Sequence, residues 1–328
     1  MQAAPNEGKK LAQSYKDNHK GETVQTMLEQ LLVPLKSLSP RSPEVSPLSP
    51  LSSPSTEIID SKTKISDYEL QAENHTKNGE IDLAIAAYQR IHPISARILV
   101  QIGRLYSDNK GDYNNALNFY TQALKLQEKT DDDTTETLTC IGRAHHERRE
   151  FDLALEYHTR ALKLHESMKS PNQAAIATNL IGISNAYRAR HELSEALAYA
   201  QRACAIREAI VPIDEVSIAS SLGTLASIYY DFGDASQALS VSMRAFEIFK
   251  RVLPPNSSET AALLNNLGAI ELSLGAMTEG RQYFEQSLQI YRQILPLEHP
   301  NLAKLENNIQ YVAKMQQYKE TNDAQVKP

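Results

Sequence analysis

Tryptophan is absent from this 328-residue sequence, phenylalanine occurs only six times and cysteine only twice. So few large aromatics fit a long, thin helical stack better than a globule with one thick core. The cysteines, Cys140 and Cys204, form no Cys-x-x-Cys or Cys/His cluster, which argues against both a disulfide framework and a zinc site. We expect two reduced core thiols in an intracellular protein.

Long apolar runs are also missing. No run approaches the roughly 20 residues that span a bilayer, so we predict no membrane insertion. Residues 1–7 are polar and lack the apolar region of a signal peptide, so we expect a cytoplasmic location, with association with the cytoskeleton as a further option. The net charge of −6 and the pI of about 5.9 give no basic field, so nucleic acid is not an expected partner.

Catalytic motifs are missing as well. Glycine-rich phosphate loops and the Gly-x-Ser-x-Gly nucleophile elbow do not occur. The cluster His145-His146-Glu147 is a candidate metal site, but adjacent histidines point about 100° apart on a helix and cannot easily share a metal. We interpret His145 as a packing residue rather than a ligand, and we predict no enzyme activity, no cofactor and no metal site.

Residues 1–65 differ in composition from the rest. Residues 37–55 are mostly Ser and Pro and cannot bury enough apolar surface to offset the entropy of ordering, so we predict a disordered tail. Residues 22–36 have helical apolar spacing and form either a docking helix or a transient one. Five Ser-Pro pairs are candidates for phosphorylation, which either folds the tail back on a basic groove or has no such role: Ser39, Ser42, Ser46, Ser49 and Ser53.

From about residue 66 the chain contains helix-length segments, with Gly and Pro concentrated in the short breaks between them. No segment alternates as a strand does, so the predicted fold class is all-α. Four small residues recur 42 residues apart: Ala154, Ala196, Ala238 and Gly280. An internal period of this length is typical of a repeat array, which is usually a binding surface.

Each repeat has three positions that are small because helix backbones cross there, where a large side chain would cost about 1–3 kcal/mol in overpacking. Across six units only Ile91 departs from the pattern: Ala72, Ala84, Ile91; Gly103, Ala116, Ala123; Gly142, Ala154, Ala161; Ser184, Ala196, Ala203; Ala226, Ala238, Ala245; and Gly268, Gly280, Ser287. We predict an array over 66–298 and a capping helix with a frayed end over 299–328. The predicted units are 66–92, 95–128, 133–169, 172–211, 214–254 and 257–297.

This pattern resembles the tetratricopeptide repeat, whose usual period is about 34 residues. The 42-residue form, with Leu-Asn-Asn-Leu-Gly at 264–268 and Leu-Pro-Leu-Glu-His-Pro at 295–300, resembles the repeats of kinesin light chains. The resemblance implies a right-handed superhelical solenoid of antiparallel helix pairs that binds cargo. Kinesin light chains also carry a heptad coiled coil that binds the motor heavy chain. Residues 1–65 hold no sustained heptads, so kinesin heavy chain is not an expected partner.

In such a solenoid the first helix of each pair lines the concave groove. Counting one residue beyond each small crossing residue, and one turn to either side, gives the positions that line the groove. Eight residues at these positions are the candidate peptide contacts: Arg97, Arg104, Arg143, His146, Asn185, Arg188, Tyr230 and Asn265. The first part of this set is basic, and arginine offers fork-shaped donors to carboxylates. The set is either a site for an acidic extended peptide or a solvated helix face without a ligand.

We therefore predict a non-catalytic protein-protein interaction scaffold or cargo adaptor that binds acidic linear motifs. The alternatives are a regulatory or targeting module of a multi-chain enzyme, and a signalling adaptor for cell polarity or cilia.

Overall fold

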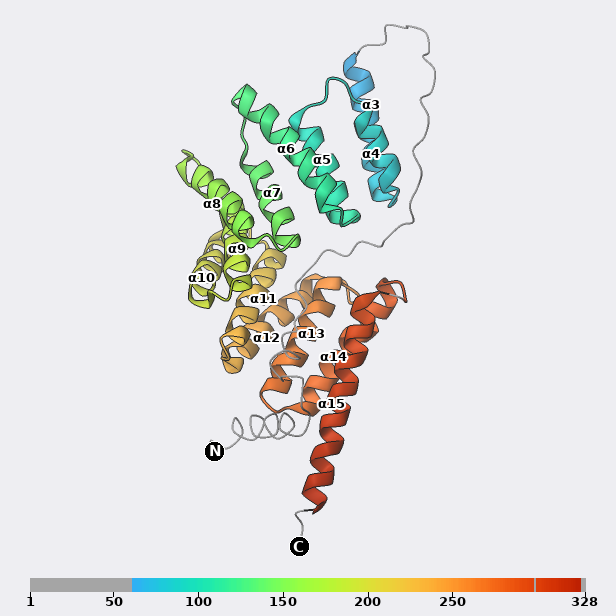
Figure 1. The fold of residues 1–328 in the computed structure, drawn as a ribbon, viewed down its shortest axis with the longest axis vertical. Helices are drawn as coiled ribbons and strands as arrows, with labels where there is room; N and C mark the ends of the chain where they lie inside the picture. Colours follow the sequence, from blue (N-terminus) through green and yellow to red (C-terminus); the bar gives the residue numbers. More distant parts are fainter. Residues whose placement is uncertain (1–60, 298, 326–328) are drawn as a thin grey trace. The chain divides into compact units, whose positions relative to one another are not determined.

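The computed structural model describes residues 61–297 and 299–325, and within these ranges it contains helices and turns but no strand (Figure 1). The all-α prediction is confirmed. The first described helix begins at Ser61. The predicted helix 22–36, the Ser-Pro segment 37–55 and its five candidate serines lie outside the described residues, and the predicted domain boundaries stay predictions.

The described helices form two compact units that divide between Pro171 and Asn172. The N-terminal unit has three helix pairs: α3 (Ser61–Lys77) with α4 (Ile81–Gln89), α5 (Ala96–Arg104) with α6 (Tyr113–Thr130), and α7 (Thr135–Glu147) with α8 (Phe151–Ser167). The C-terminal unit has three pairs and a further helix: α9 (Gln173–Ala189) with α10 (Leu193–Ala209), α11 (Glu215–Asp231) with α12 (Ala235–Val252), α13 (Ser258–Ser273) with α14 (Met277–Ile294), and α15 (Pro300–Gln325).

The first helix of every pair packs most extensively against the second helix of the same pair. All eighteen predicted crossing positions, Ile91 included, are buried. Three glycines among them face large rings of the second helix. A Cβ added at Gly103 would lie 2.4 Å from the Tyr120 ring, and one at Gly268 would lie 2.6 Å from the Phe284 ring. The small residues therefore let the helix axes approach until the rings of one helix cover the backbone of the other.

The turn inside each pair requires one residue with positive φ. Gly233 and Gly275 supply it at φ of 82° and 86°. Arg149 and His191, 42 residues apart on the same register, adopt φ of 63° and 61° at the corresponding turns. A side chain in this left-handed region is uncommon, so the repeat imposes the turn even where the sequence offers no glycine.

The second pair has one residue more between its crossing glycine and its turn. Gly103 and Gly111 are eight residues apart, whereas the corresponding spacing, for example from Gly268 to Gly275, is seven. The chain absorbs the additional residue as a π-helix, η1 (Leu105–Asn109), which continues α5. The insertion leaves the helix pair intact, and it carries Asp108 toward the next first helix.

Helix α15 packs against α14 and follows the repeat register. Asn308, 42 residues after Asn266, donates a 3.3 Å hydrogen bond to the Oδ1 atom of the fully buried Asn265. Gln310, 42 residues after the crossing glycine Gly268, is exposed. Since no second helix crosses α15 within the described residues, this position accommodates a large polar side chain.

Candidate functional site

Three of the predicted arginines lie on first helices of the N-terminal unit, and each one is paired with a carboxylate of the neighbouring first helix or of η1. Arg97 on α5 contacts Glu69 of α3, and Arg104 on α5 contacts Glu136 of α7. The Arg143 guanidinium on α7 donates to both carboxylate oxygens of Asp108, at 2.9 and 3.2 Å. We call the surface formed by these three arginines and their three acids the first-helix face of the N-terminal unit.

These ion pairs remain open to solvent. The side chains of Arg97, Arg104 and Arg143 are 65%, 37% and 52% exposed. Desolvation by burial lowers the pKa of the Arg143 guanidinium, but the Asp108 carboxylate together with Cys140 and Tyr120 outweighs this effect, so the pKa is raised. The face is therefore a row of charged groups held in place, with arginines and acids alternating across the helices, whereas the sequence predicts a mainly basic groove with Glu136 as its one acid.

His146 lies at the end of this row. Its ring is half-buried, with Nδ1 3.7 Å from a Glu147 oxygen and the ring centroid 5.5 Å from that of Phe151. The neighbouring His145 points elsewhere and stacks on Tyr157 with centroids 5.4 Å apart, as expected of a packing residue. Within residues 61–297 and 299–325, no group of three or more His, Cys, Asp or Glu side chains is placed to hold a metal ion.

The other four predicted residues belong to the C-terminal unit. The Arg188 Nε donates a 2.6 Å bond to Asp231 of the next first helix, which repeats the pairing seen in the N-terminal unit. Asn185 is partly exposed. The Tyr230 hydroxyl is buried and has no hydrogen-bond partner among the described residues, and burial raises its pKa. Asn265 is fully buried and bonded to Asn308, so it is not on an exposed surface.

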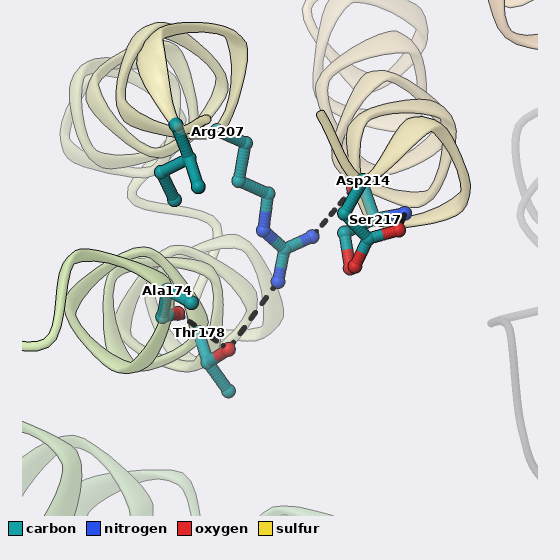
Figure 2. Close-up of a pocket in the computed structure, with 6 residues that line it drawn as sticks. Ala174, Thr178, Arg207, Asp214 and Ser217 are labelled. Atoms are coloured by element: carbon teal, nitrogen blue, oxygen red, sulfur yellow. Dashed lines mark hydrogen bonds between the residues drawn. The ribbon is translucent and has the colours of Figure 1, made fainter. Parts of the chain in front are cut away.

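Arg207 is not among the residues predicted from the sequence, because that prediction used only first helices. Arg207 extends from the second helix α10 into the space between the first helices α9 and α11 (Figure 2). Its guanidinium donates 2.7 and 2.5 Å bonds to the Ser217 carbonyl and the Ser221 hydroxyl, and a 3.4 Å bond to the Thr178 hydroxyl. It lines a small pocket, which we call the Arg207 pocket, together with Ala174, Thr178, Ile210, Asp214 and Ser217.

No helix of the described part of the chain is long and apolar enough to cross a membrane. No curated protein matches the sequence. Among solved structures, BtubC (BKLC) from P. vanneervenii is 18% identical, with 74% of this chain and 94% of that chain covered and a TM-score of 0.52. The apo form of the quorum sensor NprR from B. thuringiensis is 17% identical, with 77% of this chain and 70% of that chain covered and a TM-score of 0.61.

NprR in complex with its cognate peptide NprX is 17% identical, with 82% of this chain and 77% of that chain covered and a TM-score of 0.60. At these identities the similarity shows a shared fold. A family model described as tetratricopeptide repeat matches residues 133–209 and 217–293, and a second model with the same description matches residues 96–130. Together the two models cover more than half of the chain. These matches confirm the resemblance seen in the sequence, and the chain belongs to the tetratricopeptide-repeat family.

Proposed function

We propose that this protein is a non-catalytic interaction scaffold that binds extended acidic segments of partner proteins on the first-helix face of its N-terminal unit. The observation that carries the proposal is the row of Arg97, Arg104 and Arg143, each exposed by a third or more and each already holding a carboxylate. At Arg143 one guanidinium nitrogen, Nη2, donates to both oxygens of Asp108, which is a charge-assisted contact of the kind that arginine makes with carboxylates.

Exchange of these internal carboxylates for those of a peptide has a small cost. Solvent-exposed ion pairs contribute only about 0–1 kcal/mol to stability, so Asp108 and Glu136 hold their arginines in position without binding them tightly. A guanidinium also has five N–H donors, and one carboxylate occupies at most two of them. A peptide with acidic residues along its length can therefore bind several arginines at once.

The fold supports this proposal by analogy. NprR, which has been solved in complex with its cognate peptide NprX, shares the fold of this chain. Repeat arrays in general present extended surfaces for ligands because every unit contributes one face to a continuous surface. The analogy concerns the fold, and the choice of acidic ligands rests on the arginines of this chain.

The test uses fluorescein-labelled hexaglutamate, with labelled hexaglutamine as the uncharged comparison, and fluorescence anisotropy of the full chain. In the double variant Arg104→Glu/Arg143→Glu both cations are reversed. Because a hydrogen bond to a charged group contributes about 1.5–3 kcal/mol, we expect hexaglutamate to bind at least roughly 100-fold more weakly. The control is Arg160→Glu/Lys163→Glu, which makes the same change in net charge at exposed positions of the second helix α8.

The control variant should keep wild-type affinity within about threefold, because exposed charges more than about 10 Å from a ligand are largely screened at 0.1 M salt. Equal affinities for the two double variants, or equal binding of hexaglutamate and hexaglutamine by the wild-type chain, would contradict the proposal.

A further inference from the structure

Arg207 differs from the arginines of the first helices because it has no carboxylate partner among the described residues. Its hydrogen bonds all go to neutral oxygens, namely the Ser217 carbonyl and the hydroxyls of Ser221 and Thr178. Asp214 lines the same pocket, but its carboxylate accepts from the Ser217 amide at 3.1 Å and from the Ser217 hydroxyl at 2.6 Å. The Arg207 guanidinium is therefore solvated by neutral oxygens and is not neutralised by a direct ion pair.

The two kinds of arginine also differ in pKa. In Arg143 the Asp108 carboxylate, Cys140 and Tyr120 together outweigh desolvation and the pKa is raised, whereas in Arg207 desolvation by burial prevails and the pKa is lowered. Cys204 and Asp214 counteract this shift in Arg207 only in part. A desolvated charge without a partner is unfavourable, and proteins normally pair such charges. Asp214 acts on Arg207 only from a distance, so the guanidinium has no anion in direct contact.

The pocket is accessible and has room for a small group. It holds about 330 Å³ of space, part of which is open to solvent, and Ala174 and Thr178 at its edge are exposed. The Arg207 side chain reaches toward the Thr178 hydroxyl of α9, with Ser217 in the first turn of α11 and Asp214 just before that helix (Figure 2). Thr178 is one turn of α9 from Ile181 and two turns from Asn185, so the pocket opens on the first-helix side of the C-terminal unit.

We propose that the Arg207 pocket binds a single carboxylate, namely an acidic side chain of a partner segment, as a second anchor separate from the N-terminal arginines. The inference rests on the proposed function in so far as it takes the partner to be acidic. A carboxylate adds one negative charge and can accept directly from the Arg207 guanidinium, whereas the Asp214 carboxylate is bonded to Ser217. A phosphate dianion would place further negative charge beside Asp214, which is held ionised because the bonds from Ser217 lower its pKa.

The experiment is an NMR titration of the full chain with sodium acetate, followed on the arginine Nε–H signals, against sodium chloride at the same ionic strength. The Arg207 signal, assigned by its loss in Arg207→Lys, should shift and saturate at an acetate concentration at least roughly tenfold lower than any shift of Arg251. Arg251 is an exposed arginine of the same unit that already pairs with Glu215 at 2.8 Å, so it serves as the internal reference.

A second variant blocks the pocket without touching the hydrogen bonds of Arg207. Ala174 is exposed near the start of α9, so Ala174→Leu should fold normally and fill the pocket, and Ala174→Ser should fold normally and leave it open. We expect the leucine variant to abolish the acetate shift of Arg207 and the serine variant to retain it.

Three results would overturn the inference: no saturating shift of Arg207 with acetate, a shift with inorganic phosphate but not with acetate, or the same acetate response in Ala174→Leu as in wild type. The outcome is independent of the test of the N-terminal face. If hexaglutamate fails to bind the wild-type chain while acetate shifts Arg207 as described, the proposed peptide face is wrong and the carboxylate pocket stands. If hexaglutamate binds and acetate does not shift the Arg207 signal, the carboxylate pocket is wrong and the proposed peptide face stands.

Discussion

Gly280→Ala tests whether small residues are required where helices cross. A Cβ on Gly280 would lie 2.9 Å from the Gly268 carbonyl oxygen and 3.3 Å from the Leu272 amide nitrogen, both on the neighbouring helix α13. These are backbone atoms within a helix, so they cannot rotate away as a side-chain tip can. Helices α13 and α14 must therefore separate slightly along their contact.

The magnitude follows from two opposing effects. Alanine is a better helix former than glycine by about 1 kcal/mol, which favours the variant. Overpacking a well-packed contact costs about 1–3 kcal/mol, which disfavours it. We expect the free energy of unfolding to fall by about 1 kcal/mol, measured by urea unfolding of the full chain followed by far-UV circular dichroism.

A second substitution tests the same contact from the other side. A Cβ on Gly268 would meet the Phe284 ring at 2.6 Å and the Gly280 carbonyl oxygen at 3.0 Å. Once the helices have separated for one alanine, the other is accommodated more easily, so Gly268→Ala/Gly280→Ala should cost less than the sum of the single variants. The control Gln310→Leu, at the exposed position 42 residues after Gly268, should change stability by no more than about 0.5 kcal/mol. Stabilisation by Gly280→Ala would show that the crossing of α13 and α14 does not require a residue without a side chain.

Two further predictions concern ionisable groups. The Asp214 cap of α11 has a lowered pKa, so its stabilisation is present above its ordinary value of 3.8 and is lost as pH falls through the lowered folded value. In urea unfolding Asp214→Ala should cost about 1 kcal/mol at neutral pH, and this deficit should shrink in acid; a pH-independent deficit would contradict the assignment. Burial raises the pKa of the Cys204 thiol to about 11, so iodoacetamide at mildly alkaline pH should alkylate it only after unfolding, and fast alkylation of the native chain would disprove its burial.

The repeat could be predicted from sequence because backbone crossing restricts residue size at fixed intervals. Gly, Ala or Ser occupies every crossing position except that of Ile91, which is visible without any structure, and all of these positions are buried. The turn was harder to see where Arg149 and His191 take the left-handed conformation, because only glycine signals that conformation in a sequence.

The charge of the candidate site could not be predicted in the same way. The sequence predicts Arg97, Arg104 and Arg143 in a basic groove with Glu136 as its one acid, but it does not show that each arginine pairs with an acid 28 to 35 residues away. One of these acids, Asp108, takes its place through the additional residue of η1. Ion pairing between neighbouring helix pairs depends on how those pairs stack, and the sequence register within one pair does not specify the stacking.

Arg207 shows a second limit. A rule that assigns ligand contacts to first helices leaves out a long side chain that extends from a second helix between two first helices. Asn265 is the opposite case: the sequence predicts it on the surface, but it is buried and accepts a hydrogen bond from Asn308 of α15. Both outcomes depend on side-chain length and on the presence of the following helix.

The most direct test of the central claim is photo-crosslinking of the full chain to hexaglutamate that carries a benzophenone group, with the attachment sites mapped by mass spectrometry. The account predicts that in the N-terminal unit the crosslinks concentrate on α5, η1 and α7, where Arg104, Asp108 and Arg143 lie. Crosslinks that fall mainly on the second helices α4, α6 and α8 would contradict it.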